Sequence, residues 1–332
     1  MKAVVVVEKG RCQVLDVPVP AIGSYQALVK NEVCGICSST DWKIMQGQMA
    51  WAGPFPLALG HESVGRVVEV GDKVTKFKVG DRVTRSVLPR TEALNSAHGG
   101  FAEYGVVMDG SAVKAGAPTA EVNGYLVDRQ NVVPGSVGAV EASLAITLAE
   151  TASGMRSIGR NIRGSKVVVS GTGAAGFALA LWSKMAGASS VTVLGRRPER
   201  LELERRRFSD HAVSTADSDW VRRAEAVIGG KADVLIEGVG DVALGSEMLS
   251  LMAEGGTAVA YGAPPDGGRY DPRWIIMNVE EQRDYAWAVD MLERQIVRTD
   301  WFVTQVWDGL DSFGEAMAQV RAGTVLKGFI RI

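Results

Sequence analysis

The sequence has few cysteines, little net charge and no long apolar run. Its 332 residues include three cysteines and carry a formal net charge of −2. Three is an odd number of cysteines and no export signal is evident, so we expect no disulfide framework and a location in the reducing cytoplasm. The near-neutral charge gives no electrostatic reason to expect a nucleic acid or an anionic membrane as partner. No uninterrupted apolar stretch approaches about 18 residues, so we expect no membrane span.

What is present is a composition that can bury a sizeable core. Hydrophobic residues make up 46% of the chain and charged residues 22%, and the length suits about two domains. Before Pro134, short segments rich in β-branched residues alternate with glycine and proline, which predicts an irregular β-barrel. After Pro134, strand and helix patterns alternate, which predicts a parallel sheet covered by helices. Together the two patterns predict an α/β protein.

A glycine-rich turn lies between an apolar strand and a helical segment in "VVVSGTGAAGFALAL". Its pattern is Gly171-x-Gly173-x-x-Gly176. The first glycine permits a tight turn, the second lets the backbone approach a pyrophosphate, and the third allows close packing of helix on strand. The phosphate would sit at a helix N-terminus, where free N–H groups favour an anion. The turn therefore predicts a dinucleotide site, to which Ala174 and Ala175 also belong.

The end of the next strand indicates which dinucleotide binds. An NAD site usually places an acidic residue there for the ribose 2′-hydroxyl, but this chain has Gly195, Arg196 and Arg197. A carboxylate would repel a 2′-phosphate, whereas guanidinium groups pair with one. We therefore predict NADP(H) rather than NAD(H), with Arg200 as a further contact.

Three residues have the chemistry of a metal site. Cys37 belongs to the stretch "CGICSSTDWKIMQG", and His61 and Glu62 belong to "LALGHESVGRVVEVGDKV". Zinc binds thiolate, imidazole and carboxylate, and a catalytic zinc keeps one position open for water or substrate. These residues suit a catalytic zinc if the fold brings them together.

The motifs in their order along the chain resemble the medium-chain, zinc-dependent alcohol dehydrogenases. "GHESVGRVVEVGDKV" is similar to the zinc-site signature of that family, and "KAVVVVEKG", "CGIC", "KVGDRV", "GGFAEYGVV", the glycine-rich turn and "VLIEGVG" follow in family order. The resemblance implies a chaperonin-like catalytic barrel in residues 1–138, a Rossmann-type doubly wound sheet in 139–285 and a return to the barrel in 286–332. It also implies cofactor contacts at Gly238 and Val239.

The family's zinc cysteine falls on Cys37 and its zinc histidine on His61, with Glu62 as a ligand or exchangeable outer carboxylate. Cys34 is then a structural thiol. One catalytic zinc would act as a Lewis acid on an alcohol or carbonyl substrate, and the nicotinamide would exchange a hydride with the reacting carbon.

Two departures from the family leave alternatives open. One extra residue after Cys37 makes either Ser39 or Thr40 the hydroxyl that would relay the substrate proton, with Thr40 favoured because it precedes Asp41. Ile146 or Thr147 falls where the family has its third ligand, and neither binds zinc strongly. Glu150, one helical turn after Ile146, is our choice over Glu141 or no third protein ligand.

The lobe that holds a structural zinc in many relatives is missing. Residues 84–98, "TRSVLPRTEALNSAH", contain no cysteine, so we expect no structural zinc. Family members are commonly dimers or tetramers, and we expect a homodimer or homotetramer here.

The substrate is predicted only as a small alcohol, polyol or corresponding carbonyl compound. Trp42, Trp51, Phe55 and Trp274 are candidates for an aromatic pocket wall, with Lys43, Asp41 and Arg90 as polar contacts. Two rival interpretations are a zinc-free double-bond reductase of the same superfamily and a cofactor-binding protein without catalysis. Cys37, His61 and Glu62 argue against the zinc-free reductase.

Overall fold

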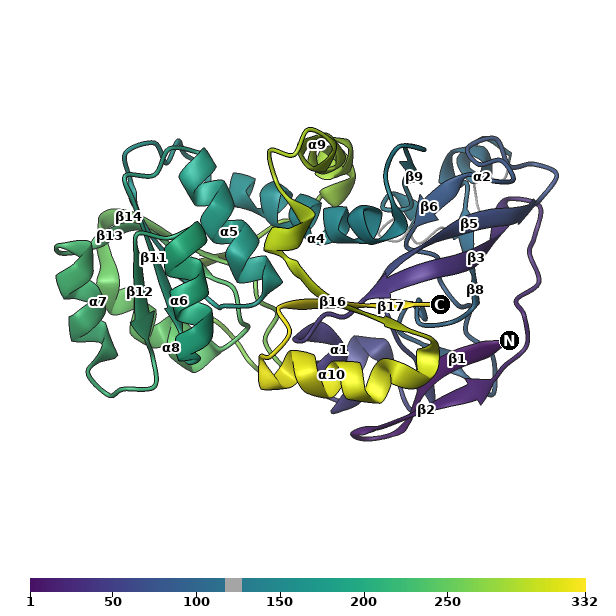
Figure 1. Ribbon diagram of the computed structural model, residues 1–332, viewed down its shortest axis with the longest axis horizontal. Helices are drawn as coiled ribbons and strands as arrows, with labels where there is room; N and C mark the ends of the chain where they lie inside the picture. Colours follow the sequence, from purple (N-terminus) through teal and green to yellow (C-terminus); the bar gives the residue numbers. More distant parts are fainter. Residues whose placement is uncertain (117–126) are drawn as a thin grey trace. The chain divides into compact units, whose positions relative to one another are not determined.

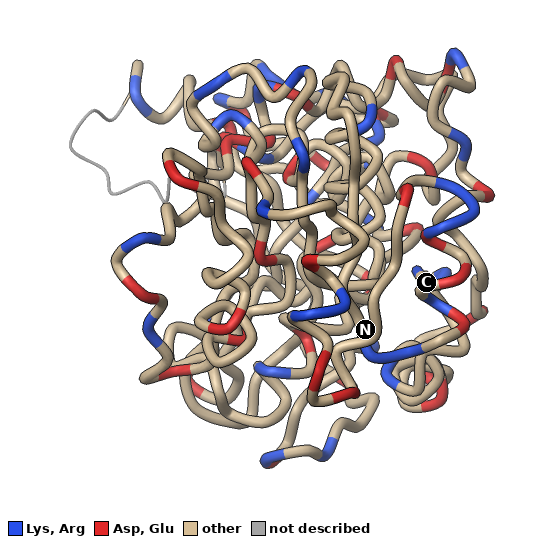
Figure 2. The backbone as a smooth tube through the Cα atoms, turned by 90° about the vertical axis from the view of Figure 1, so that its left-hand side faces the viewer, with Lys and Arg blue, Asp and Glu red and all other residues tan. Residues whose placement is uncertain are grey.

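The chain folds into two compact units, seen in a computed structural model that describes residues 1–116 and 127–332. The first unit comprises Met1–Ile146 and Tyr285–Ile332, and the second comprises Thr147–Asp284. The expected boundary at residue 138 precedes helix α4 (Ala139–Met155), whereas the two units divide within that helix. Lys and Arg residues are interspersed with Asp and Glu along the chain (Figure 2).

The first unit, for which the valine-rich segments predict an irregular β-barrel, is built from two sheets. One has the strand order β2-β1-β4-β7 and the other β16-β17-β3-β5-β6-β9, with β8 also paired to β3. The strands of this unit are β1 (Lys2–Glu8), β2 (Arg11–Asp16), β3 (Gln26–Gly35), β4 (Leu57–Ala58), β5 (Glu62–Val70), β6 (Arg82–Thr84), β7 (Asn95–Ser96), β8 (Tyr104–Met108), β9 (Val132–Val133), β16 (Val303–Asp308) and β17 (Lys327–Arg331).

Helices and short 3₁₀ turns close this unit around an apolar core. The helices are α1 (Thr40–Met45), α2 (Gly110–Gly116), α10 (Phe313–Ala322) and most of α9 (Glu281–Glu293), which begins in the second unit, and the 3₁₀ turns are η1 (Ala50–Ala52), η4 (Thr299–Trp301) and η5 (Leu310–Ser312). The rings of Phe101 and Phe313 meet edge to face at 4.9 Å in this core. Phe313 comes from the C-terminal segment, so the end of the chain is part of the first unit's core.

The last strand, β17, fixes the C-terminal segment beside the "CGIC" turn. It pairs antiparallel with β3, so that Ile330 lies opposite Cys34 and Phe329 opposite Gly35. Figure 1 shows the yellow β17 beside the purple β3. This pairing brings Lys327, at the start of β17, close to the end of β3.

The second unit is a six-stranded parallel sheet with the order β12-β11-β10-β13-β14-β15. Its strands are β10 (Lys166–Ser170), β11 (Ser190–Gly195), β12 (His211–Ser214), β13 (Ala232–Glu237), β14 (Met252–Ala260) and β15 (Trp274–Ile276). Its helices are α5 (Ala174–Met185), α6 (Pro198–Arg207), α7 (Trp220–Ile228) and α8 (Val242–Met248), with 3₁₀ turns η2 (Arg156–Ile158) and η3 (Leu249–Leu251).

The strand order places the helices on both faces of this sheet. Right-handed crossovers from β10 through β11 to β12 put α5 and α6 on one face, and the reversed direction from β12 through β13 to β14 puts α7 and α8 on the other. Phe177 and Phe208 meet at 5.6 Å on the first face, and Trp220 packs with Leu235 and Met248 on the second. The doubly wound sheet and the barrel-like first unit confirm the predicted fold class.

None of the helices in the described part of the chain combines the length and the apolar character that a membrane crossing requires.

Candidate metal centre and nucleotide-binding turn

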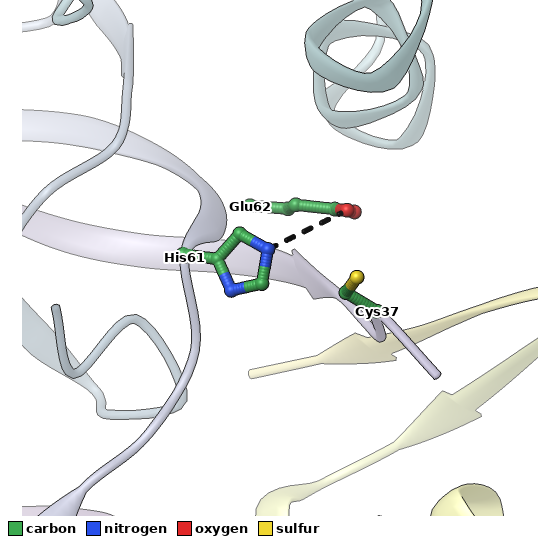
Figure 3. Close-up of side chains that lie close together, drawn as sticks. All are labelled: Cys37, His61 and Glu62. Carbon is green, nitrogen blue, oxygen red and sulfur yellow. Dashed lines mark ion pairs between the residues drawn. The ribbon is translucent and has the colours of Figure 1, made fainter. Parts of the chain in front are cut away.

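Strand pairing brings Cys37, His61 and Glu62 together in the first unit. Gly35, the last residue of β3, lies opposite Glu62, the first residue of β5. The Cys37 sulfur, a ring nitrogen of His61 and a carboxylate oxygen of Glu62 all lie within 4.8 Å of one another. Figure 3 shows the three side chains gathered at the start of β5. The structure thus places the three residues predicted from sequence in one group, hereafter the metal group.

Gly35 is required for this arrangement. A Cβ added at this position would lie 2.3 Å from Oε2 of Glu62 and 3.2 Å from Oγ of Ser143. Such a contact is far shorter than van der Waals packing permits, so only glycine leaves space for the Glu62 carboxylate. The second residue of "CGIC" is therefore explained by the approach of Glu62.

Asp41 orients two members of the metal group. Its side chain is fully buried, and Oδ2 accepts a hydrogen bond of 2.9 Å from the backbone N–H of Cys37. Its Oδ1 lies 3.1 Å from Nδ1 of His61. A carboxylate on one imidazole nitrogen fixes the ring and leaves the other nitrogen for a metal, an arrangement common around metal-binding histidines. Nε2 of His61 accordingly lies on the Glu62 side, 4.0 Å from Oε1.

Lys327 supplies a buried positive charge to the same group. It is 3% exposed, and its ammonium pairs with Oε2 of Glu62 and donates a 3.3 Å hydrogen bond to the carbonyl of Ile36. Burial opposes the charged form, but Glu62 and Cys37 outweigh it and raise the pKa of Lys327. Lys327 could not be predicted from the sequence, because it lies 265 residues after its partner Glu62.

Cys37 and His61 favour each other's charged forms. Burial favours a neutral thiol, but the hydrogen bond with His61 outweighs it and lowers the pKa of Cys37. Burial also opposes an imidazolium, yet Asp41 and Cys37 raise the pKa of His61 well above its usual range. A thiolate is the form of cysteine that binds metals, so the site prepares Cys37 for a cation. The thiolate, imidazole and carboxylate donors fit zinc, for which each is a common ligand.

The other two thiols lie outside the metal group. All three cysteines are free, and Cys34 is fully buried in the core of the first unit. Burial raises the pKa of Cys34 well above its usual value. This placement agrees with the expectation that Cys34 is a structural thiol.

The remaining candidates around the metal group stay predictions. Ser39 immediately precedes helix α1, and Thr40 is its first residue, so both hydroxyls follow Cys37 closely. Glu150 belongs to the second unit, where Oε2 accepts a 3.2 Å hydrogen bond from the hydroxyl of Tyr261. Glu141 lies in the first turn of α4.

Aromatic rings extend outward from the metal group. The ring centroid of His98 lies 5.9 Å from that of His61 and 5.8 Å from that of Trp51, and Trp51 is 51% exposed. Burial lowers the pKa of His98 to about 3, so its imidazole is neutral. Sequence reasoning missed His98, because a lone histidine in a loop gives no sign of its neighbours.

The other predicted wall residues have different surroundings. The guanidinium of Arg321 lies over the ring of Trp42, with Cζ 4.7 Å from the ring centroid. Trp274 is 5% exposed and packs in the core of the second unit beside Tyr270. The prediction that Trp274 lines a pocket is wrong, because the apolar core of the sheet takes up its ring.

The predicted glycine turn follows β10 in the second unit. Gly171 has φ +107°, in the region that favours glycine, and Gly173 precedes the first turn of α5, which begins at Ala174 and Ala175. A Cβ at Gly176 would lie 2.0 Å from the carbonyl oxygen of Gly171, so the helix packs against the turn as the motif predicts. At Gly173, no atom of the described residues lies within 4 Å of an added Cβ, which leaves space of the kind that an anion at the N-terminus of α5 would need.

Three strand ends gather around this turn. The backbone N–H of Gly171 donates to the carbonyl of Leu194 in β11, and that of Gly238 donates to Ser170 in β10. Gly195, the end of β11, is followed by exposed Arg196 and Arg197. These parallel strands end at the same edge, where an open α/β sheet binds its ligands.

Arg200 differs from the other two arginines. It is 7% exposed, and burial lowers its pKa to about 10. Arg200 is thus the most buried of the three arginines. Its contact with a cofactor stays a prediction.

A buried carboxylate shapes the loop after β13. Glu237 accepts hydrogen bonds of 2.9 Å from the N–H groups of Val239 and Gly240, and the hydroxyl of Tyr270 also donates to it. Burial and Glu237 raise the pKa of Tyr270, so the phenol keeps its proton. The loop with Gly238 and Val239 is thus held beside Gly171, whose added Cβ would lie 3.2 Å from Cγ2 of Val239.

Comparison with known proteins gives the family. The alcohol dehydrogenase GroES-like domain matches residues 23–117, and the zinc-binding dehydrogenase domain matches residues 174–284. D-altritol 5-dehydrogenase of Agrobacterium fabrum is 30% identical over 79% of this chain and 76% of its own length. D-arabinitol dehydrogenase 1 of Uromyces fabae is 26% identical over 95% of this chain and 92% of its own.

Solved structures share the fold. Benzyl alcohol dehydrogenase of Acinetobacter calcoaceticus superposes with a TM-score of 0.82 at 20% identity, covering 100% of this chain and 99% of its own. A structure described as a zinc-binding dehydrogenase of Sinorhizobium meliloti bound to NADP gives a TM-score of 0.79 at 24% identity, with coverage of 100% and 99%. The chain belongs to the medium-chain, zinc-type alcohol dehydrogenase family, as its motifs predicted. It is an oxidoreductase of the dehydrogenase type.

Proposed function

We propose that this protein is a zinc-dependent dehydrogenase that interconverts an alcohol or polyol and its ketone or aldehyde with NADP(H). The observation that supports it best is the metal group, in which Cys37, His61 and Glu62 present three zinc donors within 4.8 Å. When bound, zinc would supply a Lewis acid for the substrate oxygen, and the nicotinamide would supply or accept the hydride.

The protein's own residues prepare and orient these groups. Asp41 holds the His61 ring through Nδ1, and Lys327 balances the charge of Glu62. Ser39 or Thr40 would pass the substrate proton towards solvent, since both hydroxyls follow Cys37 at the start of α1. Glu150 is proposed as a further ligand and Glu141 as its alternative.

The NADP(H) assignment depends on charge at the end of β11. Gly195 places no carboxylate there, and the exposed Arg196 and Arg197 follow directly. A 2′-phosphate would meet positive charge and no negative charge at this position. The proposed contacts of the pyrophosphate and ribose are the turn Gly171–Gly176 and the loop of Gly238 and Val239.

A polyol substrate is favoured by the relatives and by the rings next to the metal group. Two of the relatives act, by their names, on D-arabinitol and D-altritol. Trp51 offers an exposed ring, and rings pack well on the C–H faces of sugar-like molecules. The neutral His98 between Trp51 and His61 adds ring nitrogens for hydroxyl groups.

We also infer a homodimer or homotetramer. Ile275 and Ile276 of the sheet's edge strand β15 are 48% and 63% exposed, and exposed apolar edge strands favour pairing with another chain. Light scattering of the purified protein tests this, and a monomer at micromolar concentration contradicts it.

Metal content and activity together test the central proposal. We expect about one zinc per subunit in the wild-type protein and loss of both zinc and activity in Cys37→Ala and His61→Ala. Cys12→Ser is the matched control, because Cys12 lies outside the metal group. Full activity of metal-free protein would reject zinc dependence and support the double-bond reductase. Binding of NADP(H) without turnover of any substrate would support the non-catalytic alternative.

Substrate and ligand choices need two further measurements. A screen of alcohols, polyols and ketones with NADP(H) and NAD(H) should show the highest kcat/KM for a polyol with the phosphorylated cofactor. Glu150→Gln should reduce zinc retention more than Glu141→Gln, and the reverse result would transfer the role to Glu141.

A further inference from the structure

The last residue of β11, Gly195, is packed against the side chain of Thr172 in the glycine turn. A Cβ added to Gly195 would lie 2.5 Å from Cγ2 of Thr172, and 3.3 Å from both Oγ1 of Thr172 and Cδ2 of Leu201. The φ angle of Gly195 lies outside the left-handed region, so its backbone would accept a side chain. The obstacle to a larger residue at 195 is therefore the methyl group of Thr172.

Backbone hydrogen bonds hold both segments in place. The N–H of Gly171 donates to the carbonyl of Leu194 at 2.9 Å, and the N–H of Thr215 donates to the carbonyl of Gly195 at 2.8 Å. Thr172 is itself 8% exposed. Because the turn is tied to β11 and β11 to Thr215, the backbone cannot move away cheaply from an added Cβ, and any relief must come from the packed side chain of Thr172.

We propose that Thr172 is a cofactor-specificity residue, because its methyl group leaves room only for glycine at the end of β11. This inference rests on the proposed use of NADP(H). In an NAD site, an acidic side chain at the end of the second strand binds the ribose hydroxyls. The contact between Thr172 and Gly195 excludes that side chain by size, and it leaves the position beside Arg196 and Arg197 free for a 2′-phosphate.

The proposal makes the two positions non-additive. An aspartate introduced at Gly195 alone collides with Thr172, so it removes the preference for NADP(H) without creating a site for NAD(H). Once Thr172→Ser removes the methyl group, the carboxylate fits at 195, and the remaining serine hydroxyl is able to donate to it. A change of cofactor preference therefore requires both substitutions.

Calorimetric titration with NADP+ and with NAD+ tests the cofactor part. We compare the wild-type protein, Gly195→Asp, and Gly195→Asp combined with Thr172→Ser. Gly195→Asp alone should bind NADP+ at least tenfold more weakly with no gain for NAD+, and the double variant should bind NAD+ at least tenfold more tightly than the single one. Gly195→Asp that binds NAD+ as tightly as the double variant overturns the proposal.

Urea unfolding without cofactor tests the packing part separately. Gly195→Ala should lower the unfolding midpoint, and adding Thr172→Ser to it should restore the midpoint. Gly173→Ala in the same turn should not lower it, because no atom of the described residues lies within 4 Å of a Cβ there. Additive midpoint shifts for Gly195→Ala and Thr172→Ser would contradict the packing argument. A wild-type protein that prefers NAD+ would instead overturn the proposed cofactor and, with it, the role of Thr172.

Discussion

The metal group of the first unit and the glycine turn of the second unit differ in the distance along the sequence from which their residues come. The metal group of Cys37, His61 and Glu62 is supported by Asp41 and Lys327, and these buried charges depend on long-range strand pairing. The glycine turn lies within six consecutive residues and offers backbone N–H groups without a charged side chain. The metal group is therefore sensitive to the loss of one charge, and the turn to the gain of one atom.

The largest effect is expected where a buried charge loses its partner. Lys327→Met leaves the Glu62 carboxylate in a dry site without its ammonium, which should lower the free energy of unfolding by about 3–5 kcal/mol. Chemical denaturation measures this. Arg331→Met is the matched control on the same strand, because its pair with Asp308 is exposed and should be worth at most about 1 kcal/mol. Adding Glu62→Gln to Lys327→Met should recover most of the lost stability. Equal losses of stability in Lys327→Met and Arg331→Met would contradict this account.

The turn should respond to a single added methyl group. Gly176→Ala places a Cβ 2.0 Å from the carbonyl oxygen of Gly171, and overpacking of this kind costs about 1–3 kcal/mol. Gly314→Ala in α10 adds the same atoms where none of the residues that the structure describes comes within 4 Å, so it should stabilise the protein by about 0.5–1 kcal/mol. Thermal unfolding of both variants compares them, and destabilisation by Gly314→Ala would undermine the steric explanation.

A change beside the metal group should weaken metal binding without removing a ligand. Asp41→Asn keeps the shape of the side chain but removes the charge that holds Nδ1 of His61, and such changes typically cost about 10–100-fold in metal affinity. Competition with a zinc chelator gives the affinity. Zinc binding as tight as in the wild-type protein would show that Asp41 serves only the backbone of Cys37.

The smallest effect concerns pH and a buried carboxylate of helix α6. Glu204 is fully buried, and neither carboxylate oxygen has a hydrogen-bond partner within the described residues. Burial raises the pKa of Glu204 well above its usual value, and Arg200 offsets this only in part. The folded protein thus retains a proton that the unfolded chain releases, so stability is highest below the unfolded value of about 4.3 and declines as pH rises through the folded value.

Glu204→Gln should remove this decline. Its urea midpoint should fall less between pH 5 and pH 8 than that of the wild-type protein. Glu202→Gln on the same helix is the control: hydrogen bonds from Arg205 and Arg206 lower the pKa of Glu202 to about 2, so its contribution is constant over this range. An identical pH dependence in the wild-type protein and Glu204→Gln would show that Glu204 is ionised in the folded state.

Local patterns explain what could be predicted before the structure. The strand and helix alternation predicted the doubly wound sheet, and the spacing of Gly171, Gly173 and Gly176 predicted the turn, because both depend on neighbours along the chain. His61 and Glu62 were found because a motif surrounds them. Trp274 was misplaced because a tryptophan in a loop-like segment looks the same whether it lines a pocket or a core.

Residue types and short spacings in the sequence determined the family, the fold class and the three candidate zinc donors. Only the tertiary structure decided how these donors are supported, because the charges on Asp41 and Lys327 act through space and their partners lie far along the chain. The same holds for His98 beside His61 and for Thr172 against Gly195. Positions 35 and 195 need glycine because atoms of other strands and turns lie where a side chain would be. A local sequence pattern cannot predict those neighbours.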